Sequence, residues 1–259
     1  MRTIRLDLEY DGTDFSGWQT QKQGERTVQG VLETAVAELT GSRASVIGAG
    51  RTDAGVHALC QVAAFGTDTG HSPAVIRRAL NAKLPPDVRV LRAVEAAPSF
   101  HPRYDALGKR YFYLMANTDA LSPFLRRYAA GVPGTLDVEA MARAAGEFVG
   151  AHDFRAFMAA GSGAGGNAVR SVGSAEVGVS QSIPFLGTTL AGRFITFRVQ
   201  GAGFLRHMVR TMAGTLIEVG RGKMPPSGVR EVLASGERAL AGPTAPARAL
   251  FLERVFYSR

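Results

Sequence analysis

Hydrophobic and polar residues follow a regular order through the first hundred positions of the chain. Over 4–10 every second residue is apolar or aromatic with charged residues between, which is the pattern of a half-buried strand. Apolar residues then recur at helical spacing over 28–39, between Thr27 as a predicted N-cap and Gly41 as a predicted stop. Further strands are predicted at 44–49, 61–67 and 87–94, and a second helix at 73–83. The order β-α-β-β-α-β indicates a ferredoxin-like arrangement.

The second half of the chain repeats this order of elements with insertions. Strands are predicted at 110–115, 171–179, 193–199 and 250–256, and helices at 138–149, 204–219 and 229–234. A boundary near 106–108 divides the chain into subdomains at 1–105 and 106–259. Each sheet has a face without helices that needs a partner. We therefore expect an α+β protein in which two ferredoxin-like (βαββαβ) subdomains join into one extended, mostly antiparallel sheet. Its helices would lie on one side, and the open face on the other side would form a basic groove.

Composition narrows the class of protein. The 259 residues are 46% hydrophobic and 20% charged, as in a globular protein with a substantial core. The net charge of +8 predicts a polyanionic partner, because Lys and Arg displace counterions from phosphates, although charge alone fits a basic enzyme equally well. Cys60 is the sole cysteine, which excludes an internal disulfide framework and a cysteine-based zinc site. No apolar run is long enough for a membrane span and Met1 leads directly into a strand pattern, so we expect a cytoplasmic protein.

The sequence contains no nucleotide-binding or metal-binding motif. The Gly-rich stretch 161–166 lacks the Lys-Ser/Thr ending of a P-loop, and we expect it to be a surface loop. The five histidines do not have the spacing of metal ligands. We therefore expect no metal and no cofactor.

The loop at 50–57, between two predicted strands, carries the candidate chemistry. It reads Gly-Arg-Thr-Asp-Ala-Gly-Val-His and places the Asp53 carboxylate between Arg51 and an Ala-Gly turn. Glycine lets the backbone approach a ligand closely, and a nearby guanidinium favours the charged form of the acid. An isolated Thr-Asp-Ala-Gly is more often an Asx turn at the end of a strand. The length of the match decides against that reading, because the segment resembles the active-site motif of the A family of tRNA pseudouridine synthases, whose aspartate is catalytic.

Two blocks in the second half extend the resemblance. Two basic residues, Lys109 and Arg110, precede three aromatic residues at 111–113, which on spacing alone form an ordinary strand with Tyr111 and Tyr113 on one face. In the functional interpretation, Lys109 and Arg110 meet phosphates. The resemblance identifies Tyr111 as the active-site tyrosine, which would stack on a nucleobase. The segment His-Met-Val-Arg at 207–210 lies in the predicted long helix, where Arg206 and Arg210 would be one turn apart on a solvated face. It resembles the second-domain motif of the family, which implies an RNA-facing or supporting role for Arg210.

Weaker similarities run from about residue 4 to residue 256. Trp18 belongs to an opening block at 10–19 and is either a packing anchor or an RNA contact. Leu250 opens a terminal strand similar to the one that lines the catalytic pocket of the family with an aliphatic side chain. The stretch 159–169 departs from the family pattern, so local RNA contacts there are not predicted.

The resemblance implies a reaction and its participants. Members of the family isomerise uridines at positions 38–40, in the tRNA anticodon stem-loop, and act as homodimers without a cofactor. Asp53 would be the catalytic carboxylate, either as a nucleophile at C1′ or as a base at C2′. Arg51 would orient it or fill the space of the extruded base, and Leu250 would seal the pocket.

Two other classes of protein remain as alternatives. A non-catalytic RNA-binding protein of two RRM-like modules has the same topology, but it usually carries stacking aromatics in an RNP motif that the first half lacks. A hydrolase of a phosphorylated metabolite would require a second carboxylate or a metal cluster near Asp53, and the sequence shows neither.

Overall fold

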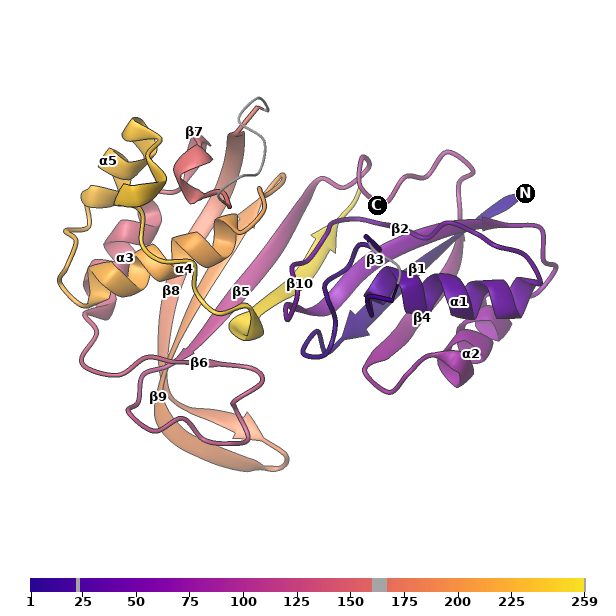
Figure 1. The fold of residues 1–259 in the computed structure, drawn as a ribbon, viewed down its shortest axis with the longest axis horizontal. Helices are drawn as coiled ribbons and strands as arrows, with labels where there is room; N and C mark the ends of the chain where they lie inside the picture. Colours follow the sequence, from indigo (N-terminus) through magenta and orange to yellow (C-terminus); the bar gives the residue numbers. More distant parts are fainter. Residues whose placement is uncertain (22–23, 160–166, 259) are drawn as a thin grey trace. The chain divides into compact units, whose positions relative to one another are not determined.

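The computed structural model describes residues 1–21, 24–159 and 167–258, so the predicted loop at 161–166 lies outside the described residues. In the described part, the chain is an α+β protein with a mixed, mostly antiparallel ten-stranded sheet and five α-helices (Figure 1). It separates into two compact units. Unit 1 comprises Met1–Lys109 and Phe251–Arg259, and unit 2 comprises Arg110–Leu250.

Unit 1 has the element order that the first half of the sequence predicts. Its strands and helices, in chain order, are β1 (Arg2–Tyr10), α1 (Val28–Thr40), β2 (Ile47–Gly48), β3 (His57–Thr67), α2 (Pro73–Lys83), β4 (Val88–Ala96) and, from the end of the chain, β10 (Leu250–Phe256). Helix α2 packs against β4 and α1.

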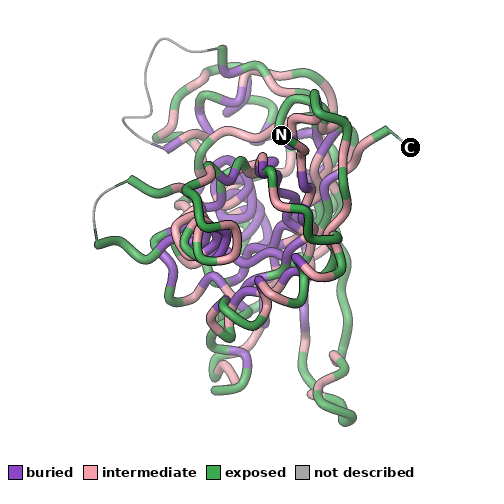
Figure 2. The backbone as a smooth tube through the Cα atoms, turned by 90° about the vertical axis from the view of Figure 1, so that its right-hand side faces the viewer, coloured by how far each residue is buried: buried purple, intermediate pink, exposed green. Residues whose placement is uncertain are grey.

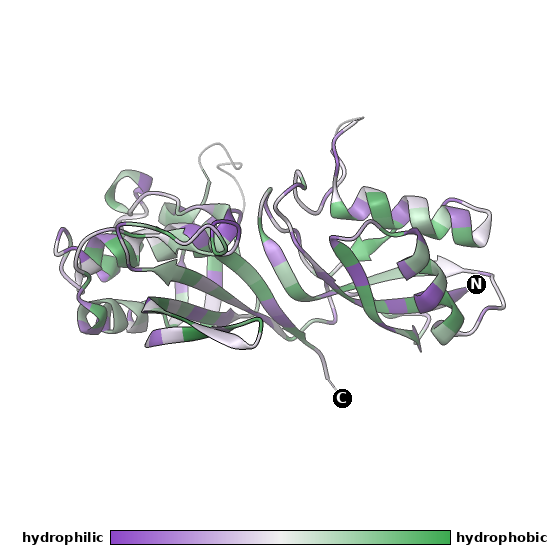
Figure 3. Ribbon diagram, turned by 90° about the horizontal axis from the view of Figure 1, so that it is seen from below, coloured by the Kyte–Doolittle hydropathy of each residue, from purple (hydrophilic) through white to green (hydrophobic). Residues whose placement is uncertain are grey.

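Local sequence explains the first two elements. In β1 the apolar residues Ile4, Leu6 and Leu8 are fully buried, whereas the charged residues between them are partly or fully exposed. Helix α1 begins where the Thr27 side chain accepts a hydrogen bond from the Gly30 N–H, and it ends at Gly41, whose φ of 71° is open to glycine. The predicted caps are therefore confirmed. Figure 3 shows hydrophobic and hydrophilic positions alternating along α1.

Strand β3 is the central strand of unit 1. It pairs antiparallel with β1, with Leu6 opposite Ala63, and β1 pairs antiparallel with β4. On its other edge β3 receives two strands: β2 pairs antiparallel with Ala63 and Ala64, and β10 pairs parallel through Phe251 opposite His57. The first residue of β3 therefore lies beside β10 and directly after the Asp53 loop.

Unit 2 contains a longer set of elements. In chain order they are β5 (Gly108–Ala116, entering from unit 1), β6 (Ala130–Gly131), α3 (Val138–Gly146), β7 (Gly150–Asp153), a 3₁₀ turn (Arg155–Phe157), β8 (Val169–Phe185), β9 (Thr188–Gly201), α4 (Met208–Gly220), α5 (Gly228–Ser235) and two further 3₁₀ turns (Arg238–Leu240 and Ala247–Ala249). Its strand order is β5-β9-β8-β7, and β6 pairs with β5.

Helix packing and aromatic side chains form the core of unit 2. Helix α3 packs against β8 and α4, and it buries Met141 and Ala145 as its pattern predicts. Phe148 makes ring contacts with Phe154, Phe157 and Phe197, and all four side chains are buried. Figure 2, in which the part that carries the N-terminus faces the viewer, shows buried backbone stretches inside and exposed ones outside.

Two predicted elements differ from the structure for physical reasons. The strand expected at 44–49 is reduced to β2, because side chains of α1 bind the backbone of Val46: Glu33 accepts its N–H at 3.1 Å and Gln29 donates to its carbonyl at 3.1 Å. The helix expected at 204–219 begins only at Met208, because His207 has a left-handed φ of 64°. The hairpin strands β8 and β9 also extend beyond 171–179 and 193–199.

Candidate active site

The Asp53 loop joins β2 to β3, as the sequence predicts. Asp53 is half-buried, Arg51 is exposed, and the flanking Thr52 and Val56 are buried. The Val56 N–H donates to the Asp53 carbonyl at 3.1 Å, which closes a tight turn through Gly55 at a φ of 78°. The loop therefore has fixed ends, with the half-buried Asp53 between them.

A second segment, residues 10–18, holds the Asp53 loop from the side. The Trp18 N–H donates to the Thr52 carbonyl at 3.0 Å, and the Gly55 N–H donates to the Phe15 carbonyl at 3.3 Å. The buried hydroxyls of Tyr10 and Thr52 are 2.9 Å apart, within hydrogen-bonding distance. Burial raises the pKa of Tyr10 to about 12, so its hydroxyl keeps its proton at neutral pH. These bonds fix the backbone on both sides of Asp53.

Glycines allow the two segments to approach this closely. A Cβ on Gly12 would overlap the carbonyl of Val56. At Gly17, whose φ is 100°, a Cβ would lie 2.7 Å from the Thr52 carbonyl oxygen and 3.2 Å from the carbonyl carbon of Asp53. Trp18 is 2% exposed, and a Cβ on Gly48 would lie 2.5 Å from its indole. Trp18 is therefore a packing anchor of this loop.

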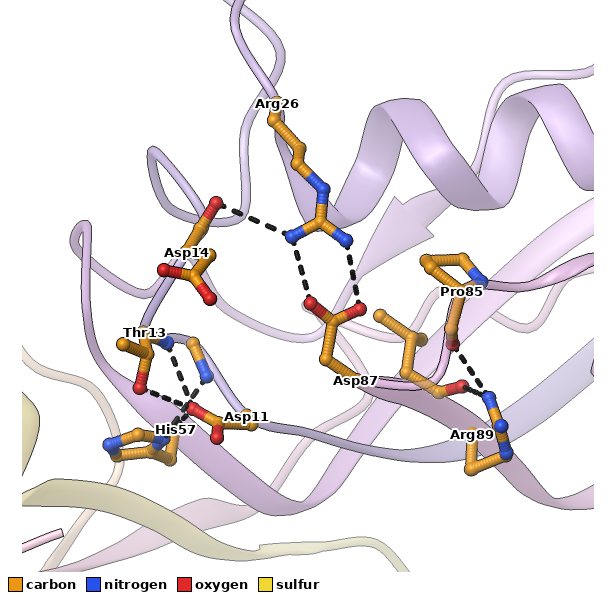
Figure 4. A network of polar contacts seen from close by, with 10 residues as sticks. Asp11, Thr13, Asp14, Arg26, His57, Pro85, Asp87 and Arg89 are labelled. Carbon is orange, nitrogen blue, oxygen red and sulfur yellow. Dashed lines mark hydrogen bonds and ion pairs between the residues drawn. The ribbon is translucent and has the colours of Figure 1, made fainter. Parts of the chain in front are cut away.

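Charged residues fix the far side of the 10–18 segment (Figure 4). Arg26 binds both carboxylate oxygens of Asp87, at 2.8 and 2.9 Å, and its guanidinium lies 4.0 Å from the centre of the Phe15 ring. The Asp11 N–H donates to the Asp87 carbonyl at 3.0 Å. The segment is thereby connected to the start of β4 as well as to the Asp53 loop.

His57 connects the same segment to β10. The Gly12 N–H donates to Nδ1 of His57 at 3.0 Å, and Oδ1 of Asp11 lies 3.1 Å from that nitrogen (Figure 4). The imidazole is buried and stacks on the ring of Phe251 with 4.6 Å between centroids. Phe251 follows Leu250 in the chain. It is therefore the neighbour of Leu250 that is fixed by His57, a residue four positions after Asp53 in the sequence.

Lys109 lies over the other end of the loop. A Cβ on Gly50 would be 3.4 Å from Cε and 3.5 Å from Nζ of Lys109. Burial lowers the pKa of Lys109 to about 8, and the positive charge of Arg103 makes a smaller contribution in the same direction. The chain continues from Lys109 through Arg110 to Tyr111.

Unit 2 holds the remaining predicted residues. Tyr111 is 7% exposed, and its ring meets that of Phe204 edge to face, 5.3 Å between centroids. Arg210 donates through Nε to the Ala245 carbonyl at 2.8 Å, and Leu250, the first residue of β10, is buried. Arg51 and Asp53 thus belong to one loop of unit 1, whereas Tyr111, Arg210 and Leu250 belong to unit 2.

Arg206, the first arginine of the predicted helical pair, is not in the helix. Arg206 precedes α4 in a turn and is exposed, while its carbonyl accepts the Ala159 N–H at 3.0 Å. Arg206 and Arg210 therefore do not lie one turn apart on a helix. The left-handed His207 between them explains the difference.

Several residues of the site had no sequence signal of their own. Tyr10, Gly12 and Gly17 lie some forty positions before the loop that they hold, and only the resemblance of the opening block marked that region. For Lys109 the sequence indicated a basic residue beside aromatics, but its burial and its position over Gly50 require the fold.

Comparison with known proteins identifies the family. The family model for tRNA pseudouridine synthase matches residues 8–105 and 144–258. The tRNA pseudouridine synthase A of Myxococcus xanthus is 48% identical over 257 residues, covering 99% of this chain and 92% of that protein. The proteins of the same name from Moorella thermoacetica and Geobacter sp. strain M21 are 46% and 44% identical, each over at least 99% of both chains. The chain belongs to the tRNA pseudouridine synthase family.

Membership in this isomerase family fits the chemistry of the site. Pseudouridine synthases rearrange a nucleoside without changing its composition, which requires an acid or base group and an enclosed base. Asp53, Arg210 and Leu250 lie within the matched segments, and Tyr111 lies between them. Among the described residues, no three His, Cys, Asp or Glu side chains are grouped as they would be around a metal ion. Across the same residues, no helix has both the length and the apolar character of a transmembrane span.

Proposed function

We propose that this protein converts uridines at positions 38–40 of the tRNA anticodon stem-loop to pseudouridine, with Asp53 as the catalytic carboxylate. The observation that carries the proposal is the loop of Asp53. Its backbone is held on both sides by the 10–18 segment, while Asp53 itself is only half-buried. Such fixed placement of a reacting group is worth several orders of magnitude in rate.

The reaction breaks the bond between N1 of uracil and C1′ of ribose and forms a bond between C5 and C1′. The C5 proton is lost to solvent and N1 gains a proton, so the product is an isomer and the balance requires no oxidant or reductant. Asp53 acts either as a nucleophile at C1′ or as a base that removes the C2′ proton. Both routes place its carboxylate under the ribose of the extruded nucleotide.

The other candidate residues have supporting roles in this proposal. Arg51 orients Asp53 or occupies the space of the extruded base, and Tyr111 stacks on the uracil. Leu250 seals the pocket, and Arg210 supports the site or contacts RNA. Two chain connections support this assembly: Tyr111 is two residues from Lys109, which lies over Gly50, and Leu250 is one residue from Phe251, which pairs with His57.

The proposal extends to the architecture and the partners. Residues 1–105 and 106–259 form two ferredoxin-like subdomains, joined in one sheet with helices on one side and a basic cleft for tRNA on the other. The net charge of +8 supports binding of a polyanion. The protein acts as a homodimer in which one tRNA contacts both subunits.

Tritium release tests the catalytic assignment. A tRNA transcript containing 5-tritiated uridine loses label to water when C5 becomes bonded to C1′. The wild type is expected to release label, and Asp53→Asn is expected to bind the transcript but release almost none. Asp68→Asn is the matched control, because Asp68 is an exposed acid of unit 1 that pairs with the N-terminus at 2.9 Å.

The outcomes separate the alternatives. Equal release by Asp53→Asn and wild type would show that Asp53 is not the essential group. Binding of tRNA without any release by the wild type would favour the non-catalytic RNA-binding alternative. Transcripts that carry uridine at only one of the positions 38, 39 or 40 determine which sites are modified.

A further inference from the structure

We propose that Lys109, in β5, is a substrate-binding residue beside the Asp53 loop, and that its ammonium binds a phosphodiester oxygen of the nucleotide presented to that loop. This inference rests on the proposed function, in which the Asp53 loop receives the RNA. The family model does not cover Lys109, which lies between its two matched segments.

The position of the ammonium is the first observation. Its Nζ lies 3.5 Å from the point where a side chain on Gly50 would begin, so it overhangs the bare backbone of the loop. Among the described residues, the hydrogen bond to the Gly50 carbonyl comes from Nε2 of the buried Gln61 at 2.9 Å and not from Lys109. A group that enters over Gly50 therefore meets this cation first.

The lack of a counter-charge is the second observation. Within the described part of the chain, no carboxylate forms an ion pair with Lys109 and no acceptor receives a hydrogen bond from it. The charged group that acts on it is the guanidinium of Arg103, which repels it, and Gly50 and Gln61 on the other side are uncharged. Partial burial without a partner disfavours the charged form, which an incoming anion would restore.

RNA supplies that anion once per nucleotide. A phosphodiester stays anionic from acidic to alkaline pH and accepts hydrogen bonds from an ammonium, which acts as a point charge. Lys109 overhangs Gly50 of the Asp53 loop, so a phosphate at Lys109 would bring its nucleotide to that loop. The contact fixes position and carries no sequence information.

Direct binding measurements test the proposal. In the Asp53→Asn background, Lys109→Met is expected to raise the Kd for tRNA about tenfold at pH 7 and to reduce the slope of log K against log salt by about 0.7 to 0.9. Arg78→Met is the matched control, because Arg78 is an exposed cation on α2. It is expected to change the Kd less than twofold.

The pH dependence identifies the ammonium. Because the pKa of Lys109 is about 8, the unmodified residue should bind tRNA well below pH 8 and lose affinity above it, up to about tenfold at pH 9. Lys109→Arg should remain charged and remove this loss, and Lys109→Met should bind weakly at every pH. Arg103→Met, which removes the repulsion, should shift the loss of affinity to higher pH.

The results that overturn the proposal are distinct from those that overturn the function. A Kd and salt slope unchanged by Lys109→Met would exclude the phosphate contact. Unchanged affinity combined with a loss of kcat in Lys109→Met alone would assign proton transfer to Lys109 and would also overturn it. Failure of the proposed active site would appear instead as tritium release by Asp53→Asn, whatever the Lys109 variants do.

Discussion

Replacing Gly17 with alanine is expected to impair catalysis through the position of the Asp53 loop. Two effects add at this residue. Its φ of 100° is unfavourable for any residue with a Cβ, which costs about 1–2 kcal/mol. The new Cβ would also lie 2.7 Å from the Thr52 carbonyl oxygen, where an ordinary contact begins at 3.4 Å, so the shortfall is 3.4 − 2.7 = 0.7 Å.

That shortfall has to be absorbed by the backbone that carries Asp53. The Cβ would lie 3.2 Å from both the Asp53 carbonyl carbon and the Ala54 nitrogen, so the whole turn is displaced and not one atom. Overpacking of this kind costs about 1–3 kcal/mol, which gives a total of about 2–5 kcal/mol of lost stability. A 1 Å displacement of a reacting group costs about a hundredfold in rate, so we expect kcat to fall by about ten- to a hundredfold.

Gly24→Ala provides the control. Gly24 has a similar φ of 91°, but nothing lies within 4 Å of the position of its Cβ. It should therefore lose only the backbone contribution of about 1–2 kcal/mol and keep its kcat. Urea unfolding measures stability for both variants, and single-turnover tritium release with excess enzyme measures the chemical step at a temperature where both are folded. If Gly17→Ala and Gly24→Ala release tritium at the same rate, the 10–18 segment does not position Asp53.

Two further predictions concern stability. Tyr10→Phe should lower the free energy of unfolding by about 1–2 kcal/mol, because it leaves the buried Thr52 hydroxyl without its 2.9 Å partner. Thr52→Val should cost about 0.5–1.5 kcal/mol, because the Tyr10 hydroxyl keeps its hydrogen bond with Gln61. The double variant should lose about 1 kcal/mol less than the sum, and strict additivity in urea unfolding would show that the two hydroxyls are not coupled. For Glu218, partial burial raises the pKa, but hydrogen bonds from Lys223 and Arg221 outweigh it, so the folded pKa lies below the usual 4.5. A lowered pKa stabilises the fold above 4.5 and the effect is lost as pH falls through the folded pKa, so Glu218→Gln should cost about 0.2–1 kcal/mol at pH 7 and nothing in strong acid. An equal cost at both pH values would contradict this origin.

Elements with local signals were predictable from the sequence. Helix α1 has its cap at Thr27 and its stop at Gly41, and β10 occupies the predicted range 250–256. The shortened β2 was not predictable, because Val46 gives its backbone hydrogen bonds to side chains of α1 that lie 13 and 17 positions earlier. The late start of α4 depends on the left-handed backbone of His207, a conformation that a residue with a Cβ rarely adopts.

The residues of the candidate site also fall into those with a local signal in the sequence and those without one. The Asp53 loop was found from a contiguous run of residues, and the structure places it between β2 and β3 as expected. The residues that hold it were not found, because a glycine at 12 or 17 does not reveal which backbone it will approach. Those contacts link positions 35 to 45 apart in the chain, and only the register of β1 on β3 brings them together.

The return of β10 to unit 1 has a consequence for biosynthesis. Phe251 and Leu252 pair with β3, and Phe251 stacks on His57, yet both are translated only after all of Arg110–Leu250. At about 5–20 residues per second, the ribosome needs on the order of ten seconds to cross unit 2. During that interval β3 has no parallel neighbour at its start, so the end of the Asp53 loop lacks the support of β10. Modification of RNA by this enzyme therefore has to wait until the polypeptide has emerged through β10.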